Sequence, residues 1–496
     1  MSEAPLVRLD SISKSFAGVR ALSDVSFAVD AGEVVCLAGE NGSGKSTLIK
    51  ILAGAERPDS GMIVISGESF KVLSPHSSVQ RGIQVIFQDF SLFPNLTVAE
   101  NIAFSAELSA KHKLVDNKRV RTLAEAVLKR IDVNLPLDAR LETLAVADRQ
   151  LVAIARALAL DARLVIMDEP TTALTEREVR SLLMTIRRLK AAGVAVLFVS
   201  HKLAEIFEVC EKIVVIRNGA IVSDAPVSEF DLDSLAYQMT GRHFPESVAR
   251  PIDLASKPVL EVAGLGREDS LHDISFDLRA GEVLGIAGLL GSGRTALAKT
   301  LFGLLPADRG EIRLDGKPIT LGSPVDAIEA GIGYVPEDRL TEGLFLPQSV
   351  ARNIFVGRLG SFSKALGWLD RSGLGAEAHE WLRRLKVAAP NPDAPVKWLS
   401  GGNQQRVVLA RWLARKPRIL ILNGPTVGVD IGSKTDIHHI IAGLSAEQLG
   451  IIVISDDLPE LIACCHRILV MRAGRIVEEI ASSKASEQEL AGKLAS

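Results

Sequence analysis

The fold of this chain is decided by the stretch Val34-Val-Cys-Leu-Ala-Gly39-Glu-Asn-Gly-Ser-Gly-Lys45-Ser46. Its apolar start, without alternation of polar residues, is typical of a strand covered on both faces of a parallel sheet. The glycines that follow allow backbone N–H groups to converge, and the run from Thr47 to Ala53 has a helical pattern. Strand, glycine loop and helix together match G-x-x-x-x-G-K-[ST], which predicts a loop that binds phosphate groups.

Composition limits the class of protein. The chain has 496 residues, 47% of them hydrophobic, a net charge of −3 and a mean hydropathy of +0.23. No basic excess is available for nucleic-acid phosphates, so nucleic acid is not expected as the main partner. No apolar run approaches the roughly 20 residues that cross a bilayer, and no secretory signal is visible at the N-terminus. We therefore expect a globular protein of the cytoplasm, with its four cysteines as reduced core thiols.

The sequence is duplicated. The loop that begins at Gly39 returns as Gly288-Leu-Leu-Gly-Ser-Gly-Arg-Thr295, and Pro170-Thr171 returns as Pro425-Thr426. The offset is close to half of the chain, which predicts two homologous domains in tandem. We place them at residues 1–240 and 259–496. The segment 241–258 between them carries three prolines among polar residues and is expected to be a linker.

Each half alternates apolar, β-branched runs with longer helical patterns. The runs Leu164 to Met167 and Val194 to Val199 predict buried strands. The fold class is therefore α/β, with a parallel-rich sheet and flanking helices in each domain. The segment from Asn101 to Leu141 is expected to be a helical subdomain inserted into the repeat. His438-His439 has no metal-ligand cluster at a suitable spacing and is expected as a pair on a helix surface.

Two carboxylates end the strand at Leu164-Val-Ile-Met-Asp168-Glu169. In a parallel sheet this end lies beside the phosphate loop, where Asp168 can hold Mg²⁺ through water and Glu169 can orient an attacking water. Lys45 would supply positive charge to the phosphates, and the Ser46 hydroxyl would be a Mg²⁺ ligand. These residues predict a site for MgATP.

Further motifs resemble the ATPase subunits of ABC transporters. They are the glycine loop, Gln88 after Gln84-Val-Ile-Phe, Leu399-Ser-Gly-Gly-Asn-Gln-Gln405, Asp168-Glu169 and His201. The resemblance covers nearly the whole chain, and the Leu399–Gln405 motif is similar to the specific ABC signature. The tandem arrangement, Val335-Pro-Glu-Asp-Arg339 and the second loop resemble the fused ATPases that power bacterial import of ribose, galactose, xylose and related monosaccharides.

The resemblance implies a role for each matched residue. Two ABC domains sandwich ATP head to tail, so the first glycine loop would pair with the second signature. Glu169, His201, Gln88 and Lys45 would be catalytic, and Ser46, Gln88 and Asp168 would hold Mg²⁺. The nucleotide would be bound by Phe16, Gly39, Glu40, Asn41, Gly42, Ser43, Gly44, Lys45, Ser46 and Thr47 of the first domain and by Ser400, Gly401, Gly402 and Gln404 of the second.

The other composite site departs from the family pattern at each position. Arg294, Glu337, Asn423, Gly424 and Asp456 stand where the first domain has Lys45, Gln88, Asp168, Glu169 and His201. Its signature, Leu144 to Gln150, lacks the serine and both glycines. Arg294 and Glu337 resemble the second domains of sugar importers, whereas Asn423-Gly424 and the weak first signature depart further from the family pattern. We expect one hydrolytic site.

The resemblance also implies partners. The chain would sit on the cytoplasmic face of the plasma membrane, bound to a separate permease and, through it, to an extracytoplasmic sugar-binding protein. Residues Asp89 to Leu96 would contact the permease. The alternatives are a tandem nucleoside importer, disfavoured by the sugar-type second loop, and a soluble tandem ABC protein acting on ribosomes or nucleic acid. The latter is disfavoured because the stretch between the domains is short and nearly neutral.

Overall fold

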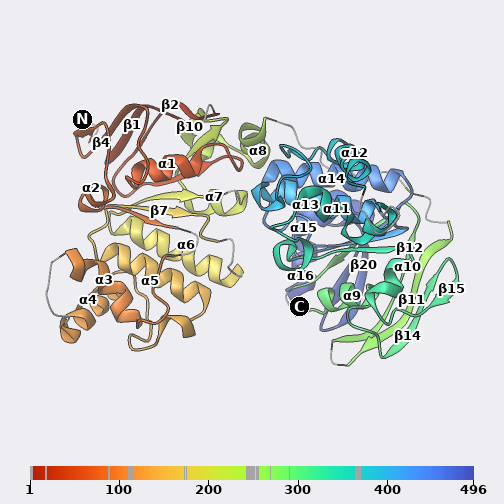
Figure 1. The fold of residues 1–496 in the computed structure, drawn as a ribbon. Helices are drawn as coiled ribbons and strands as arrows, with labels where there is room; N and C mark the ends of the chain where they lie inside the picture. The colour runs from red at the N-terminus through yellow and green to blue at the C-terminus, as the bar shows by residue number, and fades with distance from the viewer. Residues whose placement is uncertain are drawn as a thin grey trace. The chain divides into compact units, whose positions relative to one another are not determined.

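The computed structural model describes residues 4–16, 19–87, 90–109, 116–171, 174, 176–200, 202–241, 252, 256–268, 270–289, 291–362 and 370–495. The chain divides into two compact units, Met1–His243 and Phe244–Ser496. Each unit contains β-sheets with helices packed on them (Figure 1). Most of the expected linker, 241–258, lies outside the described residues.

The first unit begins with strands and then alternates strands with helices. Its elements are β1 (Val7–Phe16), β2 (Val19–Val29), β3 (Val34–Ala38), α1 (Lys45–Leu52), β4 (Ser60–Ile65), β5 (Glu68–Phe70), α2 (Pro75–Gln80), β6 (Ile83–Ile86), α3 (Val98–Ser109), α4 (Asn117–Arg130), η1 (Leu141–Thr143), α5 (Val146–Leu158), β7 (Leu164–Asp168), α6 (Glu176–Ala191), β8 (Ala195–Val199), α7 (Leu203–Val209), β9 (Lys212–Arg217), β10 (Ala220–Pro226), η2 (Val227–Glu229) and α8 (Leu232–Thr240).

Two sheets form the first unit. The larger has the order β10-β9-β3-β8-β7-β6, in which only the β9–β10 pair is antiparallel. The smaller is antiparallel, in the order β2-β1-β4-β5. Helix α1 packs in one apolar core with both sheets, through Leu48, Ile49 and Leu52. Every residue of β3 is buried, which explains why its sequence shows no polar alternation.

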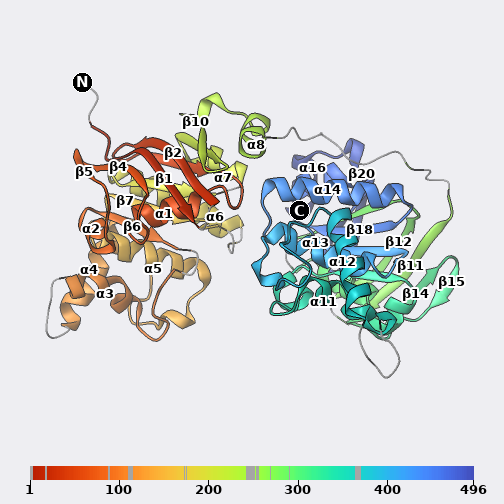
Figure 2. The same cartoon turned by 45° about the horizontal axis from the view of Figure 1, so that its top comes forward.

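Helices α5 and α6 lie on the other side of the larger sheet from α1 (Figure 1). Helices α3 and α4 lie side by side beyond them (Figure 2). The helical segment expected from Asn101 to Leu141 is therefore present as α3 and α4, but it stops early. Helix α4 ends at Arg130, and Asp132 has a left-handed φ of 51°. The chain then runs to η1 without regular structure.

The second unit has the same succession of elements. They are β11 (Pro258–Arg267), β12 (Leu271–Arg279), β13 (Val283–Ala287), α9 (Arg294–Leu301), β14 (Arg309–Leu314), β15 (Lys317–Ile319), α10 (Pro324–Glu329), β16 (Ile332–Val335), η3 (Arg339–Gly343), α11 (Val350–Phe355), η4 (Val356–Phe362), α12 (Arg371–Arg384), η6 (Val396–Trp398), α13 (Gly401–Leu413), β17 (Ile419–Asn423), α14 (Ile431–Ala446), β18 (Gly450–Ser455), α15 (Leu458–Cys464), β19 (Arg467–Arg472), β20 (Arg475–Ala481), η7 (Ser482–Lys484) and α16 (Glu487–Ala495).

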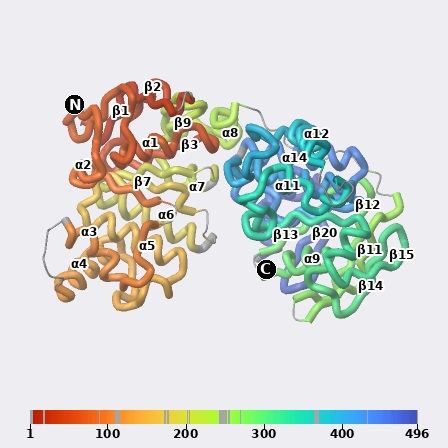
Figure 3. Tube along the Cα trace, viewed as in Figure 1, coloured from red at the N-terminus to blue at the C-terminus, as the bar shows by residue number. Residues whose placement is uncertain are grey.

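The second unit repeats the topology of the first. Its larger sheet has the order β20-β19-β13-β18-β17-β16, and its antiparallel sheet has the order β12-β11-β14-β15. The chain path in Figure 3 passes through the elements of each unit in the same sequence. The prediction of two tandem α/β domains with parallel-rich sheets is confirmed.

Two expectations from composition can be compared with the structure. Cys36, Cys210, Cys464 and Cys465 are all buried and free, as core thiols should be. Among the described residues, no helix has the length and apolar character needed to cross a membrane.

Candidate active site

The first glycine loop joins β3 to α1, and two of its residues must be glycine. Gly39 has φ 153°, and a Cβ atom there would lie 2.2 Å from the Ile216 carbonyl oxygen. Gly44 has φ 114°, and its Cβ would lie 2.6 Å from the Ala21 carbonyl oxygen. Both positions combine a left-handed backbone with contact to a neighbouring strand. The loop thus reaches the N-terminus of α1, where the helix dipole favours an anion.

Lys45 lies at the centre of this loop. Its side chain is buried, and Nζ donates hydrogen bonds to the carbonyl oxygens of Gly39 (2.7 Å) and Glu40 (2.8 Å). The neighbouring Ser43 hydroxyl is buried without a hydrogen-bond partner, whereas Ser46 is exposed. A phosphate at the loop would offer a charged acceptor to the Lys45 ammonium and the Ser43 hydroxyl. This arrangement suits a phosphate-binding loop.

Two carboxylates lie at the end of β7. The Glu169 N–H donates to the Val199 carbonyl oxygen at 3.0 Å, and Glu169 has φ 47°. The pKa of Asp168 is raised, chiefly by burial and further by the negative charge of Glu169, while Lys45 acts in the opposite direction. A partly buried carboxylate with a raised pKa beside a second carboxylate is a suitable environment for a divalent cation.

Parallel strands bring these groups to one edge of the sheet. Strands β3, β8, β7 and β6 are neighbours in that order, and their carboxyl ends meet at the same edge. The glycine loop follows β3, Asp168 ends β7, and Ser200 follows β8. Gln88 and His201 follow β6 and β8 in sequence but lie outside the described residues.

Phe16, expected to stack on adenine, is the last residue of β1. The residue is 43% exposed. The Lys14 ammonium lies 5.1 Å from the centre of the ring, a distance suited to a cation–π contact. An open aromatic ring beside a cation is compatible with nucleotide binding.

A buried carboxylate that was not predicted from the sequence connects the segments that follow β7 and β8. Glu205 accepts hydrogen bonds from the hydroxyl of Thr171 (2.7 Å) and the hydroxyl of Ser200 (3.3 Å). Thr171 lies two residues after Glu169, and Ser200 directly precedes His201. The second unit repeats this connection, with Glu460 accepting from Thr426 and Ser455. The same threonine, serine and glutamate recur in both halves of the sequence, and this repetition is the signal that could have revealed the connection.

The second glycine loop has a different charge arrangement. Arg294 is buried, and its guanidinium lies 3.2 Å from the Asp456 carboxylate and 4.0 Å from that of Glu337. The group that corresponds to Lys45 is thus already neutralised by side chains of its own unit. The carboxylates also place negative charge where a terminal phosphate would approach, which is unfavourable for binding a triphosphate.

The end of β17 has lost its carboxylates while keeping its backbone shape. Gly424 has φ 60°, and its N–H donates to the Ile454 carbonyl oxygen at 2.8 Å, as Glu169 does to Val199. Asn423, at the position of Asp168, is fully buried. The second unit therefore lacks both of the strand-end carboxylates that the first unit carries.

The Leu399–Gln405 motif forms the start of α13. Ser400 is exposed and precedes the first turn, and its hydroxyl accepts a hydrogen bond from Asn403 at 2.8 Å. Gly402 packs closely on α14, because a Cβ there would lie 2.1 Å from the Ser433 hydroxyl oxygen. Gln404 is buried and donates to the Val396 carbonyl oxygen at 3.4 Å. At the helix N-terminus Ser400 is exposed and Gly401 is partly exposed, whereas Gly402 and Gln404 are buried.

The sequence profile of the ABC transporter family matches residues 22–172 and 271–427, one segment in each unit. The chain belongs to the ABC transporter family. The matched segments contain the glycine loop and the strand-end carboxylates of the first unit and the α13 signature of the second. The resemblance inferred from the motifs is confirmed.

Relatives of this ABC protein match over its whole length. It is 42% identical to "Ribose import ATP-binding protein RbsA 2" of Streptomyces avermitilis, over 98% of this chain and 96% of that protein. It is also 42% identical to "Putative ribose/galactose/methyl galactoside import ATP-binding protein 1" of Agrobacterium fabrum, with the same coverage. A solved nucleotide-free ATP-binding cassette from an ABC transporter is 25% identical, with a TM-score of 0.41, over 46% of this chain and 93% of that structure.

Proposed function

We propose that this ABC protein hydrolyses MgATP at one composite site and thereby drives import of a monosaccharide, or a related sugar or polyol, through a separate membrane permease. The observation that carries the proposal is the distribution of intact parts. The first unit keeps the lysine loop and both carboxylates, and the second unit keeps the signature helix. The altered parts, which include Arg294 and Asp456, belong to the other composite site, formed by the second glycine loop and the first signature. The names of the relatives support sugar import.

In the proposed reaction the first glycine loop holds the phosphates of ATP, with Lys45 neutralising their charge. Glu169 orients the attacking water and His201 contacts the terminal phosphate, functions that typically contribute about 10² to 10⁴ in rate. Ser400, Gly401 and Gly402 present a helix N-terminus to the same phosphate from the second unit. The adenine ring stacks on Phe16.

The residues of the first unit fit Mg²⁺. Asp168 has a raised pKa beside Glu169, and the Ser46 hydroxyl is exposed at the start of α1. Among the described residues no group of three or more His, Cys, Asp or Glu could hold a metal ion by itself, so Mg²⁺ is expected to arrive with the phosphates. Ser46, Gln88 and Asp168 would hold it. When bound, Mg²⁺ supplies positive charge to the phosphate oxygens.

The head-to-tail pairing is tested by two arginine substitutions. Ser400→Arg should abolish hydrolysis, because it blocks the signature that completes the first loop. Ala145→Arg, at the start of the degenerate signature, should leave hydrolysis largely intact. Steady-state ATPase of both variants is the measurement. Equal loss in the two variants would reject this pairing.

The partner is tested by co-purification from membranes. We expect the chain to copurify with a polytopic membrane protein, to be peripheral on the cytoplasmic face, and to import a sugar only in that complex. Alone it should bind MgATP and turn it over slowly. Capture of ribosomes with no membrane partner would overturn the importer proposal, and transport of nucleosides would overturn the sugar assignment.

A further inference from the structure

The segment after β16 forms a fixed turn that the proposed reaction has not used. One oxygen of the Asp338 carboxylate accepts from the N–H groups of Leu340 (3.0 Å) and Thr341 (3.1 Å), and the other accepts from the Thr341 hydroxyl (2.6 Å). These bonds cap the single π-helical turn η3, and the Thr341 bonds lower the pKa of Asp338. Because the turn is capped, the direction of the next side chain, Arg339, is also fixed.

Arg339 reaches across to the loop that follows β17. Nη1 donates to the Val427 carbonyl oxygen at 2.6 Å, and Nη2 donates to the Gly428 carbonyl oxygen at 3.0 Å. Nε is buried and has no partner. Among the described residues no carboxylate forms an ion pair with Arg339, and burial lowers its pKa. Arg339 is half-buried, and a partly desolvated cation whose hydrogen bonds go only to carbonyls is a costly way to stabilise a loop, which points to a further role.

The guanidinium also contacts the first turn of α13. A Cβ atom on Gly401 would lie 2.8 Å from Arg339 Nη2 and 2.9 Å from the Gly428 carbonyl oxygen. At the next residue, a Cβ atom on Gly402 would overlap the side chain of Ser433 in α14. The signature turn is thus held on one side by Arg339 and on the other by Ser433.

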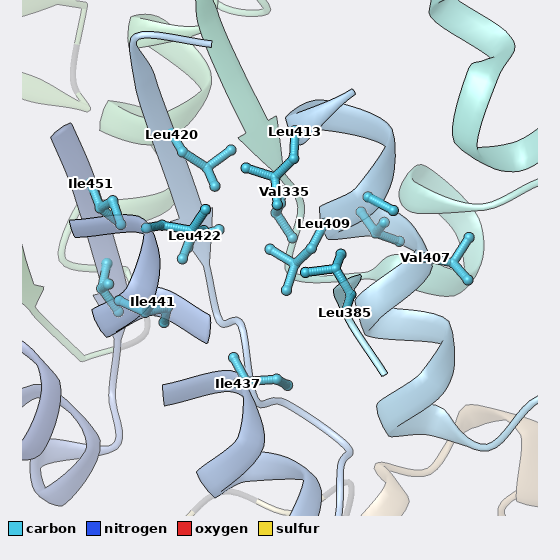
Figure 4. Packing of buried hydrophobic residues seen from close by; sticks show 14 of the residues in the cluster. Val335, Leu385, Val407, Leu409, Leu413, Leu420, Leu422, Ile437, Ile441 and Ile451 are labelled. Atoms are coloured by element: carbon cyan, nitrogen blue, oxygen red, sulfur yellow. The ribbon is translucent and has the colours of Figure 1, made fainter. Parts of the chain in front are cut away.

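The body of α13 behind this turn is firmly packed. Leu409 and Leu413 of α13 belong to one apolar cluster with Leu422 of β17 and Ile437 of α14 (Figure 4). Arg406 adds an ion pair to Asp436 at 2.6 Å. Since the helix body is fixed in this way, the freedom left to the signature lies in its first turn, where Arg339 makes contact.

We propose that Arg339 is a positioning residue for ATP hydrolysis, which holds the signature turn Ser400–Gly402 against the Val427–Gly428 loop in the geometry that meets the terminal phosphate. The inference rests on the proposed head-to-tail site. It also explains an asymmetry between the units. When Gln88 is aligned with Glu337, Phe90 of the first unit takes the position of Arg339. The signature of the first unit is the degenerate one. The degenerate signature is held instead by its own Arg149, which donates to the carbonyl oxygens of Leu144 (2.9 Å) and Glu142 (2.7 Å).

The test is Arg339→Met in the full-length chain, which removes the guanidinium and keeps a long apolar stem. We expect kcat for ATP to fall about 10- to 100-fold, the range for a small misplacement of reacting groups. The KM for ATP should stay unchanged, because the first loop still binds the nucleotide. Arg339→Lys should recover part of kcat, since an ammonium can still donate to these carbonyls.

The matched control is Arg188→Met in the first unit. Arg188 likewise donates to two backbone carbonyls, those of Ile131 and Asp132, both at 2.9 Å, and it also forms an ion pair with the Asp132 carboxylate at 2.8 Å. It should lose stability on melting to a similar extent while keeping kcat. A kcat for Arg339→Met within twofold of the unsubstituted chain, or equal losses in the two variants, would overturn the proposal. If Arg339→Met does not fold, Arg339→Lys decides, because its folded chain must show a lowered kcat at unchanged KM.

The test of Arg339 can be distinguished from the test of the head-to-tail pairing. If Ser400→Arg abolishes hydrolysis and Arg339→Met does not lower kcat, the pairing stands and the role of Arg339 is wrong. If Ser400→Arg leaves hydrolysis intact, the pairing is wrong, and the role of Arg339 is rejected with it.

Discussion

Replacing Gly402 with alanine should destabilise the second unit through one identifiable overlap. The new Cβ would lie 2.1 Å from the Ser433 hydroxyl oxygen and 2.4 Å from the Ser433 Cβ. Both atoms belong to a side chain whose hydroxyl donates to Asp430 at 3.1 Å, so it cannot move without losing that bond. Overpacking of this kind costs about 1–3 kcal/mol. In a unit of this size that corresponds to a fall in Tm of roughly 2–12 °C.

A second substitution should remove the overlap. Ser433→Gly deletes both clashing atoms, and the nearest remaining atom, the Ser433 Cα, is 3.8 Å from the new Cβ, which is an ordinary contact. Ser433→Gly alone should cost about 1 kcal/mol, since glycine is a poor helix residue. On that background, Gly402→Ala should cost almost nothing.

The assay is a four-member cycle of thermal melting and steady-state ATPase. Since the alanine methyl points toward α14, ATPase should recover in the double variant together with Tm. If Gly402→Ala costs as much stability with glycine at position 433 as with serine, the steric reasoning is refuted. Recovery of Tm without recovery of ATPase would show that the ligand itself requires glycine.

Other consequences can be measured directly. Glu169→Gln should lower ATPase of the complex by at least about 10²-fold, whereas Asn423→Asp with Gly424→Glu should add little, because Arg294 remains paired with Asp456; substantial residual activity in Glu169→Gln would show that the second loop works. Asp168→Asn should raise the Tm of the nucleotide-free chain at pH 7 and abolish its further rise with MgATP. Because the pKa of Asp168 is raised in the folded protein, ionisation of this carboxyl makes the fold less stable as pH rises from the ordinary pKa, near 4, through the raised pKa. The gain in Tm from Asp168→Asn should therefore vanish in melts below pH 4.

The fold was predictable because its signals are local. The apolar runs at Leu164 and Val194 are strands because both faces of their sheet are covered, and the glycine loop is read from consecutive residues. The length of the helical insert was overestimated at its end, where a residue with left-handed backbone, Asp132, follows α4. Sequence periodicity does not reveal where a single residue leaves the helical region.

Contacts between distant segments were not predictable in the same way. His438 and His439 were both expected on a helix surface, which is correct for His439 and wrong for His438. His438 is buried with its Nε2 3.3 Å from the Glu460 carboxylate, because α14 turns that position toward α15. The reach of Arg339 to Val427 likewise depends on the direction of a capped turn, which no local pattern specifies.

The ion pair between Arg294 and Asp456 constrains how this protein can evolve. Asp456 is the closer of the two carboxylates beside the buried Arg294 guanidinium. A reversion of Asp456 to histidine removes that partner, and a buried charge without its partner is strongly destabilising. A reversion of Arg294 to lysine places a shorter cation among carboxylates arranged for a guanidinium. Either substitution alone should therefore give a less stable protein, so stability as well as chemistry holds the second loop in its present form.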